Sequence, residues 1–228
     1  MQSVLVVGAS SGIGREIAIL FARGGARVTA VARREDRLVQ LRSQLASEGH
    51  EIRVHASDAT APGALAALGD VDILVYATGT NLPNRALTRL APEDWEMMIR
   101  VNLTGAYHAA QAVLPFMRAR RAGLIFFISS RSSIAADESG AAYQAAKRGL
   151  AGIAGAIRVE EKDNGIRTCL VCPGLTDTEI LEKRLVKPTP EMLAKALQPE
   201  DVAELVFAIA KLPSRAWVPE VQILPAAL

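Results

Sequence analysis

The sequence predicts an α/β protein built on one doubly wound parallel sheet of about seven strands. Short apolar runs recur along all 228 residues, and segments with the apolar spacing of helices separate most of them. Parallel strands need such crossovers, and helices on both faces bury a parallel sheet. No Pro-, Gly- or Ser-rich seam divides the chain, so we expect residues 1–228 to form a single domain.

Seven continuous apolar runs have the length of strands. They are Val4 to Val7, Val28 to Ala32, Ile52 to Ala56, Val71 to Val75, Leu124 to Ile128, Ile166 to Val171 and Val221 to Leu224. These runs are short enough for each to be a strand buried on both faces of the sheet. Residues three apart on a strand face opposite sides, so Cys169 and Cys172 are not expected to form a redox pair.

Helical patterns occupy the intervals between these runs. Apolar residues recur every three or four positions in Gly14–Arg23 and Glu35–Glu48. Pro92 and Pro199, each followed by Glu-Asp, suit a first helical turn, where a fixed φ and negative charge are favourable. Longer helical regions are expected over residues 94–117 and 143–163.

Composition and charge argue against several functional classes. Half of the residues are hydrophobic, and 26 basic residues against 24 acidic ones give a net charge of +2 without a basic block, so no nucleic-acid partner is expected. No run approaches the roughly 20 apolar residues of a membrane span, so no membrane partner is expected. The first apolar run is too short for a signal peptide, which predicts a cytoplasmic location. His50, His55 and His108 lack partners at metal-ligand spacing, so no metal site is expected.

A glycine-rich turn follows the first predicted strand and opens the first helix. Glycines let the backbone approach a phosphate, and the helix N-terminus favours negative charge. The residues expected to bind a dinucleotide here are Gly8, Ser10, Ser11, Gly12, Ile13 and Gly14. A purely structural tight turn is the alternative explanation.

The residues after the second strand indicate which dinucleotide binds. An acidic residue there would accept the ribose hydroxyls of NAD, whereas Arg33 and Arg34 offer cations to a 2′-phosphate, which predicts NADP(H). A solvated charge run that opens the next helix is the alternative. Asp58, at the end of the third strand, is expected to accept from the adenine amino group.

Ser130, Tyr143 and Lys147 form the predicted catalytic group. Ser130 ends an expected central strand, and the tyrosine and lysine, one helical turn apart, share a helix face. An adjacent ammonium favours the phenolate, so Lys147 is expected to lower the pKa of Tyr143 from its usual value of about 10. Tyr143 would transfer the proton and Ser130 would polarise the carbonyl, while the cofactor carries the hydride. A surface Tyr-Lys pair is the alternative.

Together these motifs resemble the short-chain dehydrogenase/reductase family over nearly the whole chain. The resemblance implies a Rossmann-like fold, catalysis by Ser130, Tyr143 and Lys147, and an Asn102 that holds a water of the proton relay. It also implies that Arg33 contacts the 2′-phosphate and that Thr178 hydrogen-bonds the nicotinamide carboxamide. Further cofactor positions that it implies are Ala77, Gly79, Tyr143, Lys147, Pro173, Gly174 and Thr176.

Several positions depart from the family's pattern. Val7 replaces a threonine, and Tyr76-Ala77-Thr78-Gly79 replaces Asn-Asn-Ala-Gly, so hydrogen bonds that stabilise the fourth strand must be replaced. Ser11 lacks the basic side chain of some NADP-dependent members, which leaves Arg33 and Arg34 to carry selectivity. Arg131 is either a contact for an acidic substrate or a solvated loop cation.

These expectations combine into an NADP(H)-dependent oxidoreductase acting on a small carbonyl or alcohol substrate. The C-terminal segment is similar to members that act on small 3-hydroxy acids, and residues 178–190 are expected to form a short lid. Two alternatives remain: an NADP(H)-binding sensor with vestigial catalysis and a 3-oxoacyl-carrier-protein reductase. The helices over residues 94–117 and 143–163 are expected to form the interface of a homodimer or homotetramer.

Overall fold

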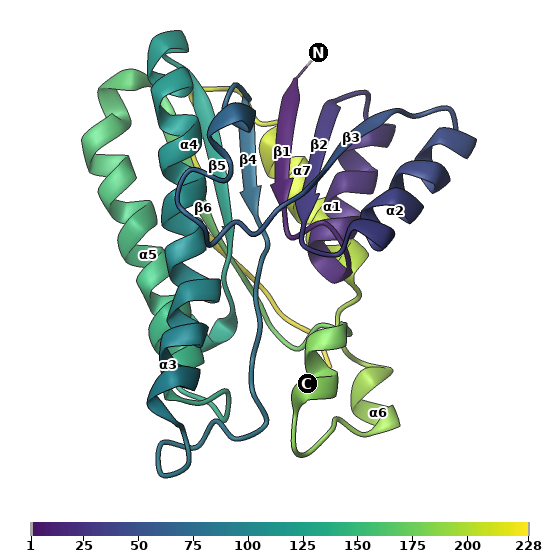
Figure 1. The fold of residues 1–228 in the computed structure, drawn as a ribbon, viewed down its shortest axis with the longest axis vertical. Coiled ribbons are helices and arrows are strands. Elements are labelled where there is room, and N and C mark those ends of the chain that lie inside the picture. Colours follow the sequence, from purple (N-terminus) through teal and green to yellow (C-terminus); the bar gives the residue numbers. More distant parts are fainter. Residues whose placement is uncertain (1, 228) are drawn as a thin grey trace.

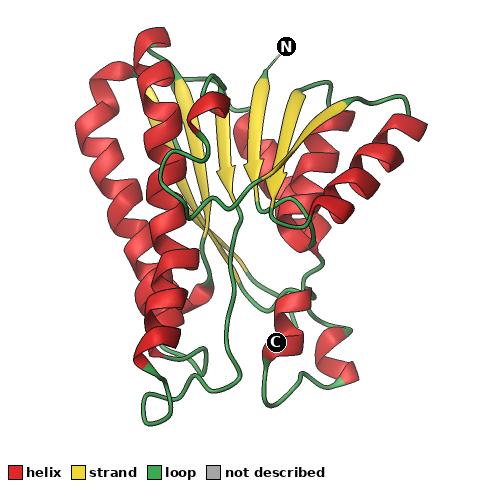
Figure 2. Ribbon diagram, in the orientation of Figure 1, coloured by secondary structure: helices red, strands yellow, loops and turns green. Residues whose placement is uncertain are grey.

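The computed structural model describes residues 2–227, which contain a seven-stranded sheet in the order β3-β2-β1-β4-β5-β6-β7 (Figures 1 and 2). Every neighbouring pair of strands is parallel. The strands are β1 (Ser3–Val7), β2 (Arg27–Ala32), β3 (Ile52–Ala56), β4 (Ile73–Tyr76), β5 (Gly123–Ile128), β6 (Ile166–Pro173) and β7 (Glu220–Ile223). The doubly wound α/β class predicted from the sequence is therefore confirmed.

Helices cover both faces of this sheet (Figure 1). One hydrophobic cluster joins the sheet to α1 (Gly12–Arg23), α2 (Glu35–Ser47) and α7 (Pro199–Ala210). The other joins it to α4 (Gly105–Arg120) and α5 (Ala141–Glu161). Cys169 lies in the first cluster and Cys172 in the second, and both thiols are free, which confirms that they face opposite sides of β6.

Burial on both faces was expected for all seven strands and is wrong for two of them. β3 and β7 are the two edges of the sheet, and most of their residues keep contact with solvent. β4 begins at Ile73 instead of Val71. Just before it, the Asp72 carboxylate accepts hydrogen bonds from the Ser3 N–H (2.7 Å) and hydroxyl (2.8 Å). The other strands agree with prediction to within two residues at each end.

The expected helix over residues 94–117 contains an irregular turn. α3 (Pro92–Ile99) continues into a π-helical turn, Arg100–Thr104, and then into α4. Such turns occur mostly as local bulges in α-helices, frequently at functional sites. Here the turn carries Asn102, whose side chain is fully buried.

Tyr76, the last residue of β4, ties the sheet to this π-helical turn. Its buried hydroxyl donates to the Val101 carbonyl at 2.7 Å. Gly105 leaves room for the phenol, since a Cβ there would lie only 2.3 Å from the Tyr76 oxygen. The tyrosine thus supplies a strand-to-helix hydrogen bond beside the segment that departs from the family's Asn-Asn-Ala-Gly pattern.

The sheet order places a topological switch point between β1 and β4. The chain leaves β1 toward β2 on one side and returns to β4 on the other, so a crevice forms at the carboxyl ends of these strands. Among residues 2–227, no helix is long and apolar enough to cross a membrane.

Tyr76→Phe should lower the free energy of unfolding by about 1–3 kcal/mol, because it leaves the buried Val101 carbonyl without its partner. Urea denaturation followed by circular dichroism would measure this loss. Tyr107→Phe is the matched control, since Tyr107 lies on α4 with 47% of its surface exposed. Equal stability of the two variants would contradict the assigned role of the Tyr76 hydroxyl.

Candidate active site

A cleft of about 900 Å³ opens at the carboxyl ends of the central strands. This volume lies within the range typical of small-molecule sites. The cleft is lined by the predicted residues Gly8, Ser10, Ser11, Gly12, Ile13, Gly14, Arg33, Arg34, Asp58, Ala77, Gly79, Ser130, Tyr143, Lys147, Pro173, Gly174, Thr176 and Thr178. Of the residues predicted for the site, Asn102 alone does not line it.

The glycine turn packs closely against the backbone that follows β4. Gly8 has a φ of +97°, and a Cβ there would lie 2.7 Å from the Thr78 nitrogen. A Cβ at Gly14 would lie 2.4 Å from the Gly8 carbonyl oxygen. Larger residues would therefore push the turn away from β4 and reshape the floor of the cleft.

The N-terminus of α1 suits an anion. Its N-cap residue, Ser11, makes no side-chain capping hydrogen bond, and the first turn holds no acidic residue. The N–H groups of that turn therefore remain available to a ligand, and the helix dipole favours negative charge there. The turn and the helix end together fit the pyrophosphate of a dinucleotide.

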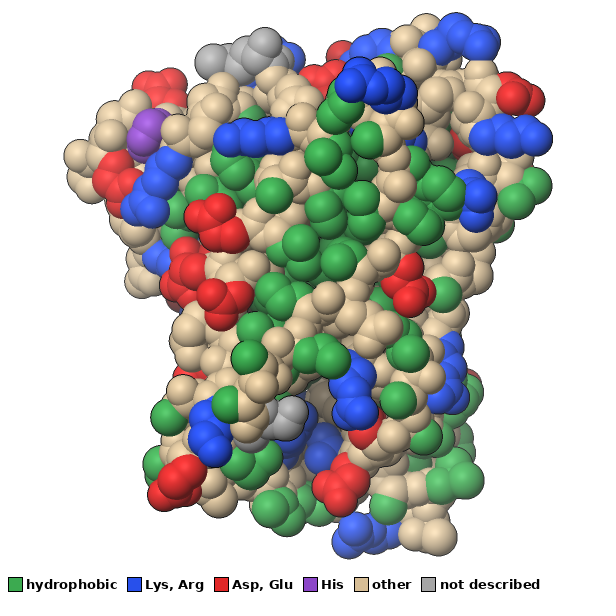
Figure 3. Space-filling view, turned by 180° about the vertical axis from the view of Figure 1, so that it is seen from behind, with side chains coloured by type: hydrophobic (Ala, Val, Ile, Leu, Met, Phe, Trp, Pro, Cys, Tyr) green, Lys and Arg blue, Asp and Glu red, His purple; other side chains and the backbone are tan. Residues whose placement is uncertain are grey.

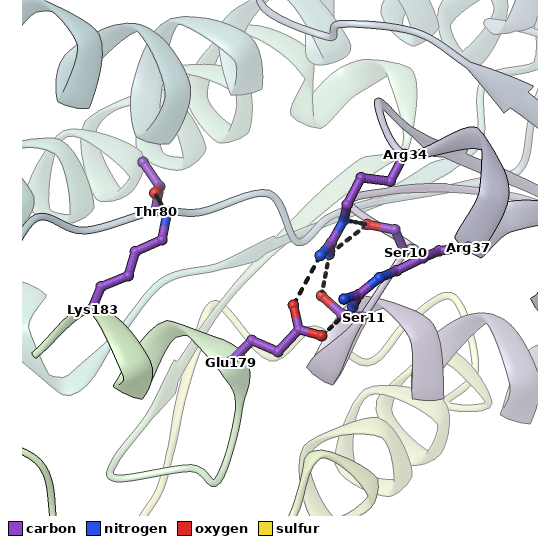
Figure 4. Close-up of polar contacts among 7 residues, drawn as sticks. All are labelled: Ser10, Ser11, Arg34, Arg37, Thr80, Glu179 and Lys183. Carbon is purple, nitrogen blue, oxygen red and sulfur yellow. Dashed lines mark hydrogen bonds and ion pairs between the residues drawn. The ribbon is translucent and has the colours of Figure 1, made fainter.

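Arg34 lies directly against the glycine turn (Figure 4). Its guanidinium donates to the Ser10 hydroxyl at 2.9 Å and to the Ser11 hydroxyl at 2.7 Å. It also pairs with Glu179 at 2.9 Å, and Arg37 pairs with the same carboxylate. This cluster offers donors to a 2′-phosphate, and Arg37 and Glu179 are members of it that sequence reasoning missed.

Arg33 and Asp58 lie on the neighbouring wall of the cleft. A hydrogen bond from the Thr60 N–H (2.9 Å) holds the pKa of Asp58 below its usual value, and the charge of Arg33 lowers it further. Asp58 is therefore ionised at neutral pH and able to accept hydrogen bonds. Its expected contact with adenine stays a prediction.

The segment after β6 closes the cleft from the opposite side. Thr178 lies against the glycine turn, since a Cβ at Gly12 would be 3.1 Å from its methyl carbon. The Thr176 hydroxyl donates to the Gly174 carbonyl at 3.2 Å, which stabilises the turn. The segment continues as a 3₁₀ turn, Glu179–Lys183, and the short helix α6 (Pro190–Leu193).

Tyr143 and Lys147 lie on α5 and line the cleft. Ser130, two residues after the end of β5, lines it as well. The Lys147 nitrogen lies 5.6 Å from the centre of the Tyr143 ring. The same nitrogen donates to the Ile128 carbonyl at 2.9 Å, and only 3% of the lysine surface is exposed. The structure thus brings together the three side chains that the sequence places on separate segments.

The expected acidification of Tyr143 by Lys147 is wrong in this structure. Burial raises the pKa of Tyr143 to about 12, although the Ser130 hydroxyl offsets part of that effect. Asp137 raises this pKa further, and Arg184 opposes it. Burial also lowers the pKa of Lys147 to about 8, because loss of solvent disfavours the ammonium. Tyr143 therefore keeps its proton at neutral pH.

Ser130 belongs to a hydroxyl network that the sequence did not suggest. Its hydroxyl donates to the Ser132 hydroxyl at 3.0 Å, which donates to the Asp137 carboxylate at 2.6 Å. Asp137 also accepts from the Ser139 N–H at 2.8 Å, and an Asp-x-Ser turn of this kind has a recognisable sequence signal. The network fixes Ser130 at the edge of the cleft.

Asn102 is committed to backbone partners. Its carboxamide oxygen accepts from the Thr80 N–H at 3.0 Å, and its nitrogen donates to the carbonyls of Thr80 (3.1 Å) and Met98 (2.9 Å). A Cβ at Gly79 would lie 3.3 Å from that oxygen and 3.4 Å from the Lys147 nitrogen. Asn102 and Lys147 therefore flank Gly79 below the cleft.

The end of the cleft beyond Tyr143 carries positive charge from Arg85, Arg131, Lys183 and Arg184. Arg85 packs on Gly140 just before α5, where a Cβ would lie 2.7 Å from the arginine Cβ. Burial and the nearby Arg184 lower the pKa of Arg85, and the charges of Asp137 and Glu138 oppose this effect. In the described chain neither Arg85 nor Arg184 forms an ion pair.

Figure 3 shows the back of the molecule, where hydrophobic side chains run down the middle and Lys and Arg side chains border a hollow below them. Residues 2–227 include no group of three or more His, Cys, Asp or Glu side chains placed to hold a metal ion.

Comparison with known sequences identifies the family. A family model described as short chain dehydrogenase matches residues 2–188. An uncharacterized oxidoreductase from Staphylococcus saprophyticus is 30% identical over 237 residues, which cover 97% of this chain and 95% of that protein. One from Staphylococcus aureus is 30% identical over 229 residues, covering 97% of this chain and 96% of that protein.

Solved structures agree over the full length. An alcohol dehydrogenase from Thermococcus sibiricus, complexed with 5-hydroxy-NADP, has a TM-score of 0.87 and 27% identity, covering 100% of this chain and 98% of that one. A serine dehydrogenase complexed with NADP+ has a TM-score of 0.87 and 29% identity, covering 97% and 94%. Serine dehydrogenase from Escherichia coli has a TM-score of 0.84 and 28% identity, covering 97% and 96%. With fold, cleft and sequence in agreement, the chain belongs to the short-chain dehydrogenase/reductase family of oxidoreductases.

Proposed function

We propose that this protein transfers a hydride between NADP(H) and a small carbonyl or alcohol substrate. One observation carries the proposal: a single cleft joins an anion-binding glycine turn, flanked by Arg33 and Arg34, to Tyr143, Lys147 and Ser130. The relatives complexed with NADP+ or 5-hydroxy-NADP support the choice of cofactor. Arg34 with Ser10 and Ser11 would hold the 2′-phosphate, and the N-terminus of α1 would face the pyrophosphate.

The chain's own residues would supply the proton. When bound, the nicotinamide cofactor provides the hydride chemistry. Tyr143 is protonated at neutral pH, since its pKa lies at or above the ordinary value for a phenol, and it could donate that proton to a developing alkoxide. The Ser130 oxygen accepts from the Ser132 N–H at 3.2 Å, and the Ser130 hydroxyl would turn its proton from the Ser132 hydroxyl to the same substrate oxygen. Lys147 would stabilise the charge that develops. Asn102, bonded to the backbone of Thr80 and Met98, would fix the backbone next to Gly79.

The substrate side of the cleft favours a carbonyl compound that bears a carboxylate. Arg85 and Arg184 are half-buried, and each keeps its guanidinium available to a ligand oxyanion. Charge-assisted pairing with arginine is the usual way to hold a carboxylate. The similarity to serine dehydrogenases, whose named substrate is an amino acid, is consistent with this choice.

Several broader expectations stay predictions. We propose that residues 1–228 act as one catalytic unit, that the protein is cytoplasmic, and that it forms a homodimer or homotetramer through α4 and α5. Both helices expose large apolar side chains, namely Tyr107, Phe116 and Val159. A sensor with vestigial catalysis and a carrier-linked 3-oxoacyl reductase remain the alternative functions, and the substrate panel described below distinguishes them.

Tyr143→Phe should lower kcat for carbonyl reduction by at least about 10²-fold, because it removes the proton donor and leaves the ring in place. NADPH binding, measured by fluorescence titration, should change little. Undiminished turnover would contradict the role of Tyr143. NADPH binding by wild-type protein that reduces no carbonyl would favour the sensor.

Wild-type protein should reduce short 3-oxo acids at a higher kcat/KM than their methyl esters, measured at the nicotinamide absorbance. Arg85→Met should narrow this ratio at least about tenfold, since a hydrogen bond to a charged group is lost. Arg89→Met is the matched control, because Arg89 is exposed on the same loop and outside the cleft. Preference for acyl-thioesters over free acids would instead favour the carrier-linked reductase.

Light scattering coupled to size-exclusion chromatography should give at least twice the 24.3 kDa chain mass. Val159→Glu on α5 should shift the protein toward monomer, because it places a charge in the proposed apolar interface. Val39→Glu on α2, outside that interface, is the control. A wild-type mass of one chain would contradict the proposal.

A further inference from the structure

Glu179 begins a strap, defined as residues 179–184, that spans the mouth of the cleft. At one end Glu179 contacts Arg34 and Arg37 beside the glycine turn. At the other end the Lys183 ammonium donates at 2.6 Å to the hydroxyl of Thr80, which lies in the segment that follows β4. Figure 4 shows these contacts on opposite sides of the cleft.

The carboxylate of Glu179 occupies the anion-binding site that Arg34 and Arg37 form. Arg34 bonds it at 2.9 Å and also donates to the hydroxyls of Ser10 and Ser11, while Arg37 pairs with its other oxygen. The hydrogen bond from Arg37, and to a smaller extent that from Arg34, lowers the pKa of Glu179, so this side chain carries a full negative charge at neutral pH. Glu179 thus occupies the donors that the proposed function assigns to the 2′-phosphate.

We propose that Glu179 is an internal rival of the 2′-phosphate for Arg34 and thereby sets how strongly the protein prefers NADP(H) to NAD(H). The inference rests on the proposed NADP(H) binding. Two anions cannot share one guanidinium closely without repulsion, so the phosphate has to displace the carboxylate from Arg34. The uncharged 2′-hydroxyl of NAD(H) makes no such demand, and Glu179 can keep Arg34 when that cofactor binds.

The exposure of this cluster sets the size of the effect. Side-chain exposure is 42% for both Arg34 and Glu179, and 38% for Arg37. Solvent screens ion pairs at such positions, so each contributes little on its own. Removing the rival carboxylate should therefore change affinity severalfold. If Glu179 instead oriented Arg34 toward the phosphate, its removal would weaken NADPH binding.

Calorimetric titration of wild-type protein, Glu179→Gln and Glu182→Gln with NADPH and NADH tests this inference. Glu179→Gln should bind NADPH about three- to fivefold more tightly than wild type and NADH within about twofold, as expected for loss of an exposed ion pair. Glu182→Gln is the matched control, since it removes the same charge from the same strap and Glu182 makes no ion pair with the described side chains. Both of its affinities should stay within about twofold of wild type.

Adenosine 2′,5′-bisphosphate and 5′-AMP isolate the phosphate contact from closure over the nicotinamide. The Glu179→Gln gain should appear with the bisphosphate and not with 5′-AMP, and should shrink at 0.5 M salt. Glu179→Ala should agree in sign with Glu179→Gln. An unchanged NADPH-to-NADH ratio, or weaker NADPH binding by both variants, would overturn the inference.

These binding measurements separate this inference from the proposed catalytic function. Protein that binds NADPH but reduces nothing would remove the enzymatic proposal, and the effect of Glu179 on affinity would still decide the inference. Failure of all three proteins to bind NADPH and the bisphosphate would overturn both.

Discussion

The cleft depends on how closely the turn after β1 approaches the backbone after β4. Gly8 meets the backbone at residues 77 and 78 at a distance that admits no side chain, and Gly14 meets Gly8 in the same way. This contact holds the N-terminus of α1 above the switch point of the sheet. The same strand end leads to Gly79, which lies between Asn102 and Lys147. The proposed phosphate site and the proposed proton-transfer site thus share one backbone junction.

Burial governs the chemistry above that junction more than charge pairing does. The Lys147 ammonium donates to the Ile128 carbonyl and is shielded from solvent, so its pKa is lower than that of an exposed lysine. Desolvation likewise keeps the proton on Tyr143 at neutral pH. A protonated phenol next to a serine hydroxyl fits reduction of a carbonyl, in which the developing alkoxide takes a proton.

Charge is distributed unevenly along the cleft, and the strap connects its two ends. Near the glycine turn, Glu179 pairs with both Arg34 and Arg37 and offsets one of their two positive charges. Beyond Tyr143, Arg85 and Arg184 have no carboxylate in ion-pair contact among residues 2–227. The strap contributes Glu179 to the first end and Arg184 to the second, so one short segment lines both ends of the cleft. Movement of the strap would change both environments together.

The sequence by itself determined the α/β class, the places of the strands, the glycine turn and the Tyr-Lys pair, because each depends on local spacing. Apolar runs, glycine positions and an i, i+4 relation are written along the chain. Only the tertiary structure decided which strands are edges, that Arg34 lies on the glycine turn, and that Glu179 faces Arg34 from 145 residues away. It also reversed the expected pKa shift of Tyr143, because desolvation depends on what surrounds a group from every direction and not on its nearest neighbour in the helix.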